Sequence, residues 1–406
     1  MKYLFLLAFA ALAAVAASES IPGTPAEIPD LSRIEHDLSA ITGLEFRHPV
    51  PAATMSRAEL KRYINEQVKE NTKPKEIHAT EATLKLLGLV PQKFDLRKTT
   101  IDLLSEQAEA FYDYRRRKLF LIGTQAGAEL EMALAHELGH ALADQHFNLK
   151  RYMNTRNSSD DEAMARMAVM EGQASWLMAA YASRKITGKI ADLTRFFDPS
   201  SAVNDQTAAS YPVFAAAPLY VRESLIFPYA EGMRFEAALY KKDGQRSFSE
   251  VFQKAPESTQ QVIHPERYEK GDKPDLPDAP RLPAGYKDIL DGTLGEFDFR
   301  VLLTVYGTRQ EADKISGHLA GATYRTGENR HTKADMIAFA AEWDSPESAR
   351  RFLSLYAEAL EKKAGACTFS KRTDTELAGR NQAGYFRVDA DGATLRATEG
   401  APSRLE

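Results

Sequence analysis

The sequence predicts a mainly helical α+β protein in two parts, and two observations lead to this prediction. Up to about residue 272, apolar residues recur at three-and-four spacing in a series of segments, broken by one pair of short β-like runs. After residue 284, strand-like and helical segments alternate. Between them, residues 273–284 carry a proline at every third position, which favours an extended linker. We therefore expect a helical domain over 18–272 and a small α+β domain over 285–406.

The composition excludes several classes of protein. The chain has 406 residues, of which 44% are hydrophobic and 27% charged, as is usual for a globular protein. Its net charge of −5 argues against nucleic-acid binding through a strongly basic surface. Cys367 is the only cysteine, so neither an intrachain disulfide nor a cysteine-based zinc site can form.

The first seventeen residues have the features of an export signal. Lys2 is followed by an apolar run from Leu4 to Ala16, which ends in small residues suited to cleavage. The run is short for a membrane span, and no lipoprotein cysteine follows it. We expect a signal peptide over 1–17 and a secreted or periplasmic protein, without a stable membrane anchor after cleavage.

The segments before residue 123 predict four helices and a hairpin. The helices are expected near 31–41, at 57–70 after the capping-box sequence that starts at Ser56, at 80–87 before Gly88, and at 98–109. Two β-like runs, 110–114 and 118–122, flank three arginines and predict a β-hairpin. One strand of this hairpin could form a sheet edge that binds an extended peptide, although a solvated basic turn also explains the arginines.

The next helix carries the pattern His136-Glu137-Leu138-Gly139-His140. Spacing of four places both imidazoles on one helix face, about 5–6 Å apart at Cβ, which suits two nitrogen ligands of one tetrahedral zinc ion. Glu137 lies roughly 100° round the helix. From there it is better placed to accept a proton from water than to join the ligands. We predict His136 and His140 as metal ligands and Glu137 as a general base.

The third ligand has two candidates in the sequence. Glu171 is a carboxylate in an apolar stripe of a helix that begins at 160–162, and the small residues beside it would let another helix approach. His146 stands at the third-histidine spacing of the metzincin class. That class needs a glycine at Ala143 so that the chain can turn, and with alanine there the helix is expected to continue. We therefore prefer Glu171 over His146.

The rest of the chain predicts further helices and a few strands. Helices are expected at 219–241 with a kink at Pro228, at 248–254 and at 259–263. In the last part, 336–343 is predicted as a strand and 346–363 as a helix with an N-cap and a proline at its first position. Two strands, 383–388 and 393–397, flank the turn signal Asp391-Gly392, while 299–306 fits either a helix or a strand.

These motifs resemble a known group of enzymes. His136-Glu137-Leu-Gly-His140 followed by Glu171-Gly-Gln-Ala resembles the gluzincin metallopeptidases, the thermolysin-like class. The stretch after His136 and the segment Glu257–Tyr268 are similar to a little-characterised family of exported bacterial zinc peptidase-like proteins. The likeness covers roughly residues 85–268. It implies a zincin-like catalytic domain, with His136, His140 and Glu171 as zinc ligands.

One departure from the thermolysin-like pattern concerns the residues around the ligands. That class has an aspartate four residues after the ligand glutamate, where this chain has Ser175. The partner that orients a histidine must then come from elsewhere, and Asp144, one turn after His140, is a candidate. For the oxyanion donor, Tyr229, Arg234 and His264 are available, and we favour His264.

From these residues we expect an exported zinc metallopeptidase acting on a peptide or protein substrate, with Glu137 as the general base. Two other functions stay open. One is a zinc amidohydrolase acting on a non-protein amide such as those of the cell wall. The other is a non-catalytic zinc-binding module. The sequence does not indicate the cleavage preference, the oligomeric state or the role of the last domain.

Overall fold

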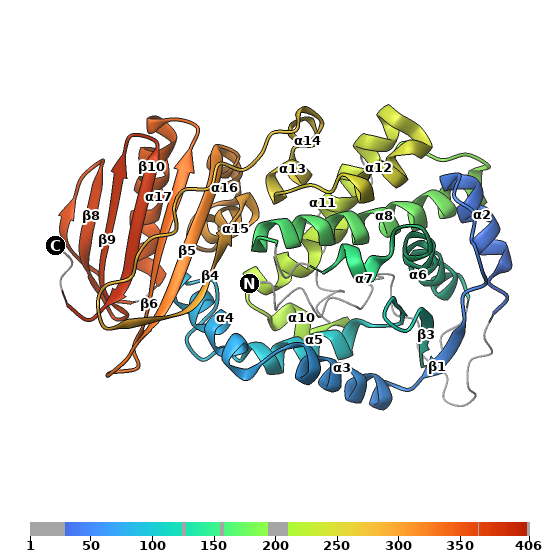
Figure 1. The fold of residues 1–406 in the computed structure, drawn as a ribbon, viewed down its shortest axis with the longest axis horizontal. Helices are drawn as coiled ribbons and strands as arrows, with labels where there is room; N and C mark the ends of the chain where they lie inside the picture. Colours follow the sequence, from blue (N-terminus) through green and yellow to red (C-terminus); the bar gives the residue numbers. More distant parts are fainter. Residues whose placement is uncertain (1–28, 124–126, 155–157, 194–209, 364, 404–406) are drawn as a thin grey trace.

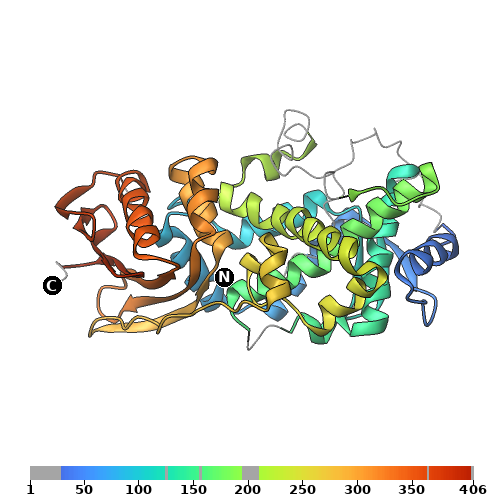
Figure 2. The same cartoon turned by 90° about the horizontal axis from the view of Figure 1, so that it is seen from above.

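The computed structural model describes residues 29–123, 127–154, 158–193, 210–363 and 365–403. The predicted signal peptide at 1–17 lies outside these residues. The fold is mixed α+β and mainly helical, as predicted, and the molecule is elongated, with helices at one end and a sheet at the other (Figures 1 and 2). Among the described residues, no helix is both long enough and apolar enough to span a membrane.

The first part consists of helices around one small sheet. The helices are α2 (Ser32–Thr42), α3 (Arg57–Asn71), α4 (Pro74–Leu87), α5 (Leu96–Gln107), α6 (Ala128–Phe147), α7 (Leu149–Tyr152), α8 (Asp160–Thr187), α10 (Pro212–Ala216), α11 (Leu219–Asp243), η3 (Gly244–Arg246), α12 (Ser247–Gln253), α13 (Thr259–Ile263) and α14 (Pro265–Lys270). The strands are β1 (Ala52–Met55), β2 (Ala110–Asp113) and β3 (Lys118–Ile122). The predicted helices and hairpin are therefore present, with α4 beginning earlier than expected because Pro74 fits its first turn.

The small sheet places a free strand edge beside α6. Its order is β1-β3-β2, with β2 antiparallel and β1 parallel to β3. The hairpin of β2 and β3 is the one predicted, whereas β1 was not expected. The two outer strands are therefore β1 and β2, and β2 is the one that contacts α6.

The second part is a seven-stranded antiparallel sheet with helices against it. Its elements are β4 (Tyr286–Leu294), α15 (Glu296–Tyr306), α16 (Arg309–Ser316), β5 (Leu319–Asn329), β6 (Asp335–Trp343), α17 (Pro346–Lys363), β7 (Thr368–Arg372), β8 (Glu376–Asn381), β9 (Gly384–Asp391) and β10 (Thr394–Ala401). The strand order is β4-β5-β6-β10-β9-β8-β7. The helix over 346–363 and the hairpin around Asp391-Gly392 are as predicted, and 296–306 is a helix.

Residues far apart in the sequence join the two parts. Helix α4 contacts β4, β5 and β6 (Figure 1). The Thr83 hydroxyl lies 2.7 Å from that of Thr326. At the start of α8, the Asp161 carboxylate accepts hydrogen bonds from the hydroxyl of Thr259 at 2.6 Å and from its backbone N–H at 3.1 Å. Burial raises the pKa of Asp161 to about 7, although Thr259 acts against this. The backbone N–H of Asp161 also donates to the hydroxyl of Thr293 in β4 at 3.2 Å, so the helix that carries Glu171 is anchored beside the large sheet.

Candidate metal centre

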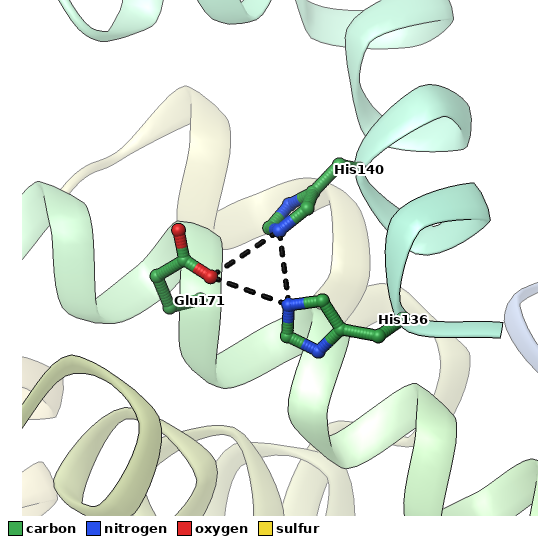
Figure 3. A group of neighbouring side chains, drawn as sticks. All are labelled: His136, His140 and Glu171. Atoms are coloured by element: carbon green, nitrogen blue, oxygen red, sulfur yellow. Dashed lines mark hydrogen bonds and ion pairs between the residues drawn. The ribbon is translucent and has the colours of Figure 1, made fainter. Parts of the chain in front are cut away.

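Helix α6 presents two histidines from a buried position in the helical part. Leu130, Leu134, Leu138 and Leu142 are buried along the helix, so three-and-four spacing fixes its orientation in the core. His136 and His140 lie one turn apart, with ring centroids separated by 4.8 Å and planes nearly perpendicular, at 87°. Both imidazoles point towards α8 (Figure 3).

Small residues let α6 lie close to α8, and α8 lie close to α11. A Cβ built on Gly139 of α6 would lie 3.4 Å from the Cα of Ala174, in ordinary contact. On the other side of α8, a Cβ on Gly172 would overlap the backbone of Gly232 in α11. Only glycine therefore permits this helix crossing. The sequence predicted a close helix approach beside Glu171, and these contacts confirm it.

Glu171 completes a group of three donor atoms with the two histidines. The Oε2 atom of Glu171 lies 3.3 Å from Nε2 of His136 and 3.2 Å from Nε2 of His140, and the two nitrogens are 3.1 Å apart (Figure 3). Ligands about 2.0–2.1 Å from a tetrahedral zinc ion are separated from one another by about 3.3 Å. The three side chains, exposed by only 3%, 7% and 3% for His136, His140 and Glu171, form a buried group that could hold a metal ion.

The charges within the group are those of metal ligands before binding. Burial would raise the pKa of Glu171, but His140 and His136 together lower it to about 2, so the carboxylate is ionised. Burial lowers the pKa of His136, which favours the neutral imidazole with a free lone pair. The pKa of His140 is raised, because the attraction of Glu171 outweighs its burial. Without a metal, a proton on His140 balances the charge of Glu171, and a bound cation would take the place of that proton.

Glu137 lies outside this group and faces strand β2. Its carboxylate accepts a hydrogen bond of 2.6 Å from the backbone N–H of Tyr112, at the free edge of the small sheet. Burial and the nearby charge of Glu171 raise the pKa of Glu137 to about 8, although His140 acts to lower it. The sequence predicted a general base next to the two histidines. The carboxyl group of Glu137 lies there and is not one of the three donor groups.

His146 is engaged away from the group. Helix α6 continues to Phe147, as expected from alanine at 143, and carries His146 beyond His140. There its Nε2 lies 2.8 Å from the carbonyl oxygen of Glu45, and its Nδ1 lies 3.4 Å from the guanidinium of Arg47. His146 therefore ties the segment before β1 to the end of α6, and the donor group does not include it.

The expectation that Asp144 orients a histidine is not met by its contacts. Its carboxylate accepts hydrogen bonds from the Tyr112 hydroxyl at 3.0 Å and from the backbone N–H of Leu149 at 2.8 Å. Tyr112 thus holds Glu137 with its backbone and Asp144 with its side chain. The sequence reasoning missed this tyrosine, and only its place in a β-like run before the motif could have drawn attention to it.

The three candidate oxyanion donors lie in different places. The ring of Tyr229 stacks on that of His136, with centroids 5.9 Å apart, so this tyrosine borders the donor group. Arg234 contacts Glu231 at 3.4 Å on the same helix. His264 lies between α13 and α14, where its Nε2 is 3.1 Å from the Glu296 carboxylate at the large sheet. The contacts favour Tyr229 over His264, which the sequence reasoning had preferred.

Comparison with known proteins gives a match for the part of the chain that forms the large sheet. Residues 284–405 match the family model described as a domain of unknown function (DUF8575). No curated protein and no solved structure matches the chain. The donor group lies outside the matched residues, so the resemblance to gluzincins stays a prediction.

Proposed function

We propose that this protein is a zinc-dependent hydrolase of peptide bonds, with His136, His140 and Glu171 as the zinc ligands. The observation that carries the proposal is the buried triangle of donor atoms, 3.1–3.3 Å on each side, with Glu137 beside it. Two imidazoles and one carboxylate are a common donor set of catalytic zinc, which leaves a fourth position for substrate or water. When bound, zinc polarises the scissile carbonyl and lowers the pKa of water towards 7.

Glu137 supplies the proton transfers in this proposal. Its carboxylate takes the proton of the attacking water and passes it to the leaving amine. The backbone N–H of Tyr112 fixes one carboxylate oxygen at 2.6 Å and leaves the other available for this exchange. A pKa of about 8 in the absence of a cation would fall when a divalent ion is held nearby, because the positive charge favours the carboxylate.

The proposal includes the location and the substrate. An exported peptidase acting on a peptide or protein agrees with the export signal expected from residues 1–17. An extended substrate is supported by the position of β2, an outer strand next to Glu137, since the edge of such a strand pairs with peptide backbone beyond the N–H of Tyr112 that Glu137 already binds.

One observation favours a second candidate, a zinc site without catalysis. All three ligands are at most 7% exposed, so the described residues leave them little contact with solvent. A structural zinc site is closed in this way, whereas a catalytic one keeps an open position. The presence of Glu137 favours the hydrolase, because a structural site needs no base.

Metal analysis and activity assays on the purified protein separate these candidates. We expect about one zinc ion in the buried group. We also expect zinc-dependent hydrolysis of casein, stopped by a chelator and restored by zinc. Hydrolysis of peptidoglycan fragments instead of casein would move the substrate to the cell wall. A zinc-loaded protein inactive on both would leave the non-catalytic module.

A further inference from the structure

A second cluster of donor side chains lies where α4 meets the large sheet. His78 of α4, Glu328 of β5 and Asp335 of β6 place one ligand atom each within 4.8 Å of one another. Figure 1 shows α4 beside the sheet strands, and α4 contacts both β5 and β6. The three donors therefore come from both parts of the molecule, although His78 and Asp335 are far apart in the sequence.

The two carboxylates are held opposite each other by the sheet. Glu328 and Asp335 are direct partners in the register of β5 and β6, at the end of this hairpin. Like charges directly opposite on neighbouring strands repel and destabilise the pair. Lys333 contacts one oxygen of Glu328 at 3.0 Å, and this is the only ion pair of the two acids within the described residues. The cluster thus has a place for a further cation.

Two unpartnered groups indicate where this cation would bind. The Oδ1 atom of Asp335 is buried without a hydrogen-bond partner, which costs free energy unless a donor or an ion satisfies it. His78 is exposed, and in the described part of the chain it makes no hydrogen bond and no ion pair. Its imidazole is therefore free to turn towards the acids.

We propose that His78, Glu328 and Asp335 form a second metal site, which binds Zn²⁺ and joins α4 to the β5–β6 hairpin. An imidazole with two carboxylates suits a divalent transition metal better than calcium or magnesium, which prefer oxygen ligands alone. In the described residues His78 makes no ion pair with either acid, whereas both histidines of the buried centre contact Glu171, so binding would draw the side chains of the second site together. Because the site joins two parts of the fold, zinc bound there stabilises the folded protein.

Zinc stoichiometry of the metal-free, full-length protein tests this site. Each variant is equilibrated with buffered free Zn²⁺ and its bound zinc is measured by mass spectrometry. We expect about two ions for the wild type and one fewer for His78→Ala. The matched control is His331→Ala, which removes an exposed histidine from the same hairpin and keeps the wild-type count.

The two zinc sites are distinguished by a second pair of variants. Glu171→Ala should lose one ion, and the double variant with His78→Ala should lose both. If Glu171→Ala fails to fold, Glu328→Gln tests the second site instead. It should bind the same number of zinc ions per chain as His78→Ala. An unchanged count in His78→Ala and Glu328→Gln would overturn the proposal, whatever the buried centre does.

Thermal unfolding gives an independent readout. Saturating zinc should raise the unfolding temperature of the wild type more than that of His78→Ala. Hydrolytic activity, if present, should be the same in both proteins, because His78 belongs to another cluster than the proposed catalytic group. An equal zinc-induced rise in both proteins would contradict a role of the second site in joining α4 to the sheet.

Discussion

The two clusters of donor side chains differ in how firmly the fold holds them. His136, His140 and Glu171 lie in the middle of the helical part, and their donor atoms are 3.1–3.3 Å apart. His78, Glu328 and Asp335 lie at the seam between α4 and the sheet, where His78 is exposed and makes no ion pair with either acid within the described residues. Both clusters take ligands from elements distant in the sequence, yet only the first is already arranged around one point.

This difference shows what packing adds to a set of ligands. In the buried centre, Gly172 and Gly232 allow α8 and α11 to cross closely, and the donor atoms of α6 and α8 already lie together, so the donors need little rearrangement on binding. At the seam, a sheet register fixes two donors while the third is on an exposed helix face. We therefore expect tighter zinc binding at the buried centre than at the seam. Substituting a ligand, or a residue that packs behind it, should show which site each bound zinc ion occupies.

The largest effect is expected for Glu171→Ala. Removal of this carboxylate leaves two imidazoles in a buried site, so zinc at the centre and hydrolysis should both be lost. Zinc bound per chain and activity are the measurements. His146→Ala is the matched control and should keep zinc, because His146 contacts Glu45 and Arg47. Loss of zinc in the control with retention in Glu171→Ala would move the protein into the metzincin class.

Glu137→Gln should separate zinc binding from catalysis. The ligands are untouched, so zinc content should equal that of the wild type. The amide cannot take a proton from water, and the rate of hydrolysis should fall by at least about 100-fold. The turnover of the zinc-loaded variant at saturating substrate is the measurement. Near-full activity would show that another group acts as the base.

Gly172→Ala tests the helix crossing that supports the buried centre. The new methyl group would overlap the backbone of Gly232, so the helices must move apart, at a cost of about 3 kcal/mol in unfolding free energy. Denaturant unfolding and zinc affinity should both show the loss. Gly317→Ala is the control, because its methyl group would lie 3.5 Å from His264 in ordinary contact. Equal effects of the two substitutions would show that the crossing does not set the ligand spacing.

Asp161→Asn tests the contact between the start of α8 and the large sheet through its pH dependence. The folded-state pKa of Asp161, about 7, lies above its ordinary value of 3.8, so the folded protein holds a proton that the unfolded chain has released. Stability therefore falls as the pH rises from about 4 to 7. Between pH 5 and pH 8, the unfolding free energy of Asp161→Asn should increase by about 2 kcal/mol relative to that of the wild type.

Denaturant unfolding of wild type and Asp161→Asn at the two pH values measures this gain. Asp298→Asn can be compared with Asp161→Asn in the same measurement, because burial also raises the pKa of Asp298, to about 6. If the unfolding free energy of the wild type and that of Asp161→Asn change with pH in the same way, Asp161 is not protonated in the folded protein.

The smallest effect is expected for His264→Ala. Its Nε2 contacts Glu296 at the sheet, so turnover should stay within about twofold of the wild type. Tyr229→Phe should reduce turnover more, because Tyr229 stacks on His136. Turnover of both variants at saturating substrate is the measurement. A large loss in His264→Ala with none in Tyr229→Phe would restore the preference drawn from the sequence.

Local sequence signals predicted much of the helical framework and part of the site. The capping box at Ser56 and the proline at the first position of α17 marked helix starts that the structure has. The four-residue spacing of His136 and His140 and the alanine at 143 predicted a continuous helix that carries both imidazoles on one face. These predictions succeeded because they depend on interactions between residues close in the chain.

Other elements were missed because their signal comes from distant partners. Strand β1 has four residues and is defined by its pairing with β3, more than sixty positions later. Strands β4 and β5 are polar on one side and mixed in composition, so their propensities were too weak to reveal a seven-stranded sheet. The contact of His264 with Glu296 could not be foreseen for the same reason, since Glu296 lies beyond the linker.

The sequence alone determined the donor types, the helix that presents two of them and the position of Glu137 between them. Tertiary structure decided which third residue reaches the histidines, that Tyr112 holds Glu137, and that α4 meets the sheet at a second donor cluster. The reason is physical. Spacing along one helix fixes the directions of its own side chains, whereas the distance between elements depends on how their surfaces pack.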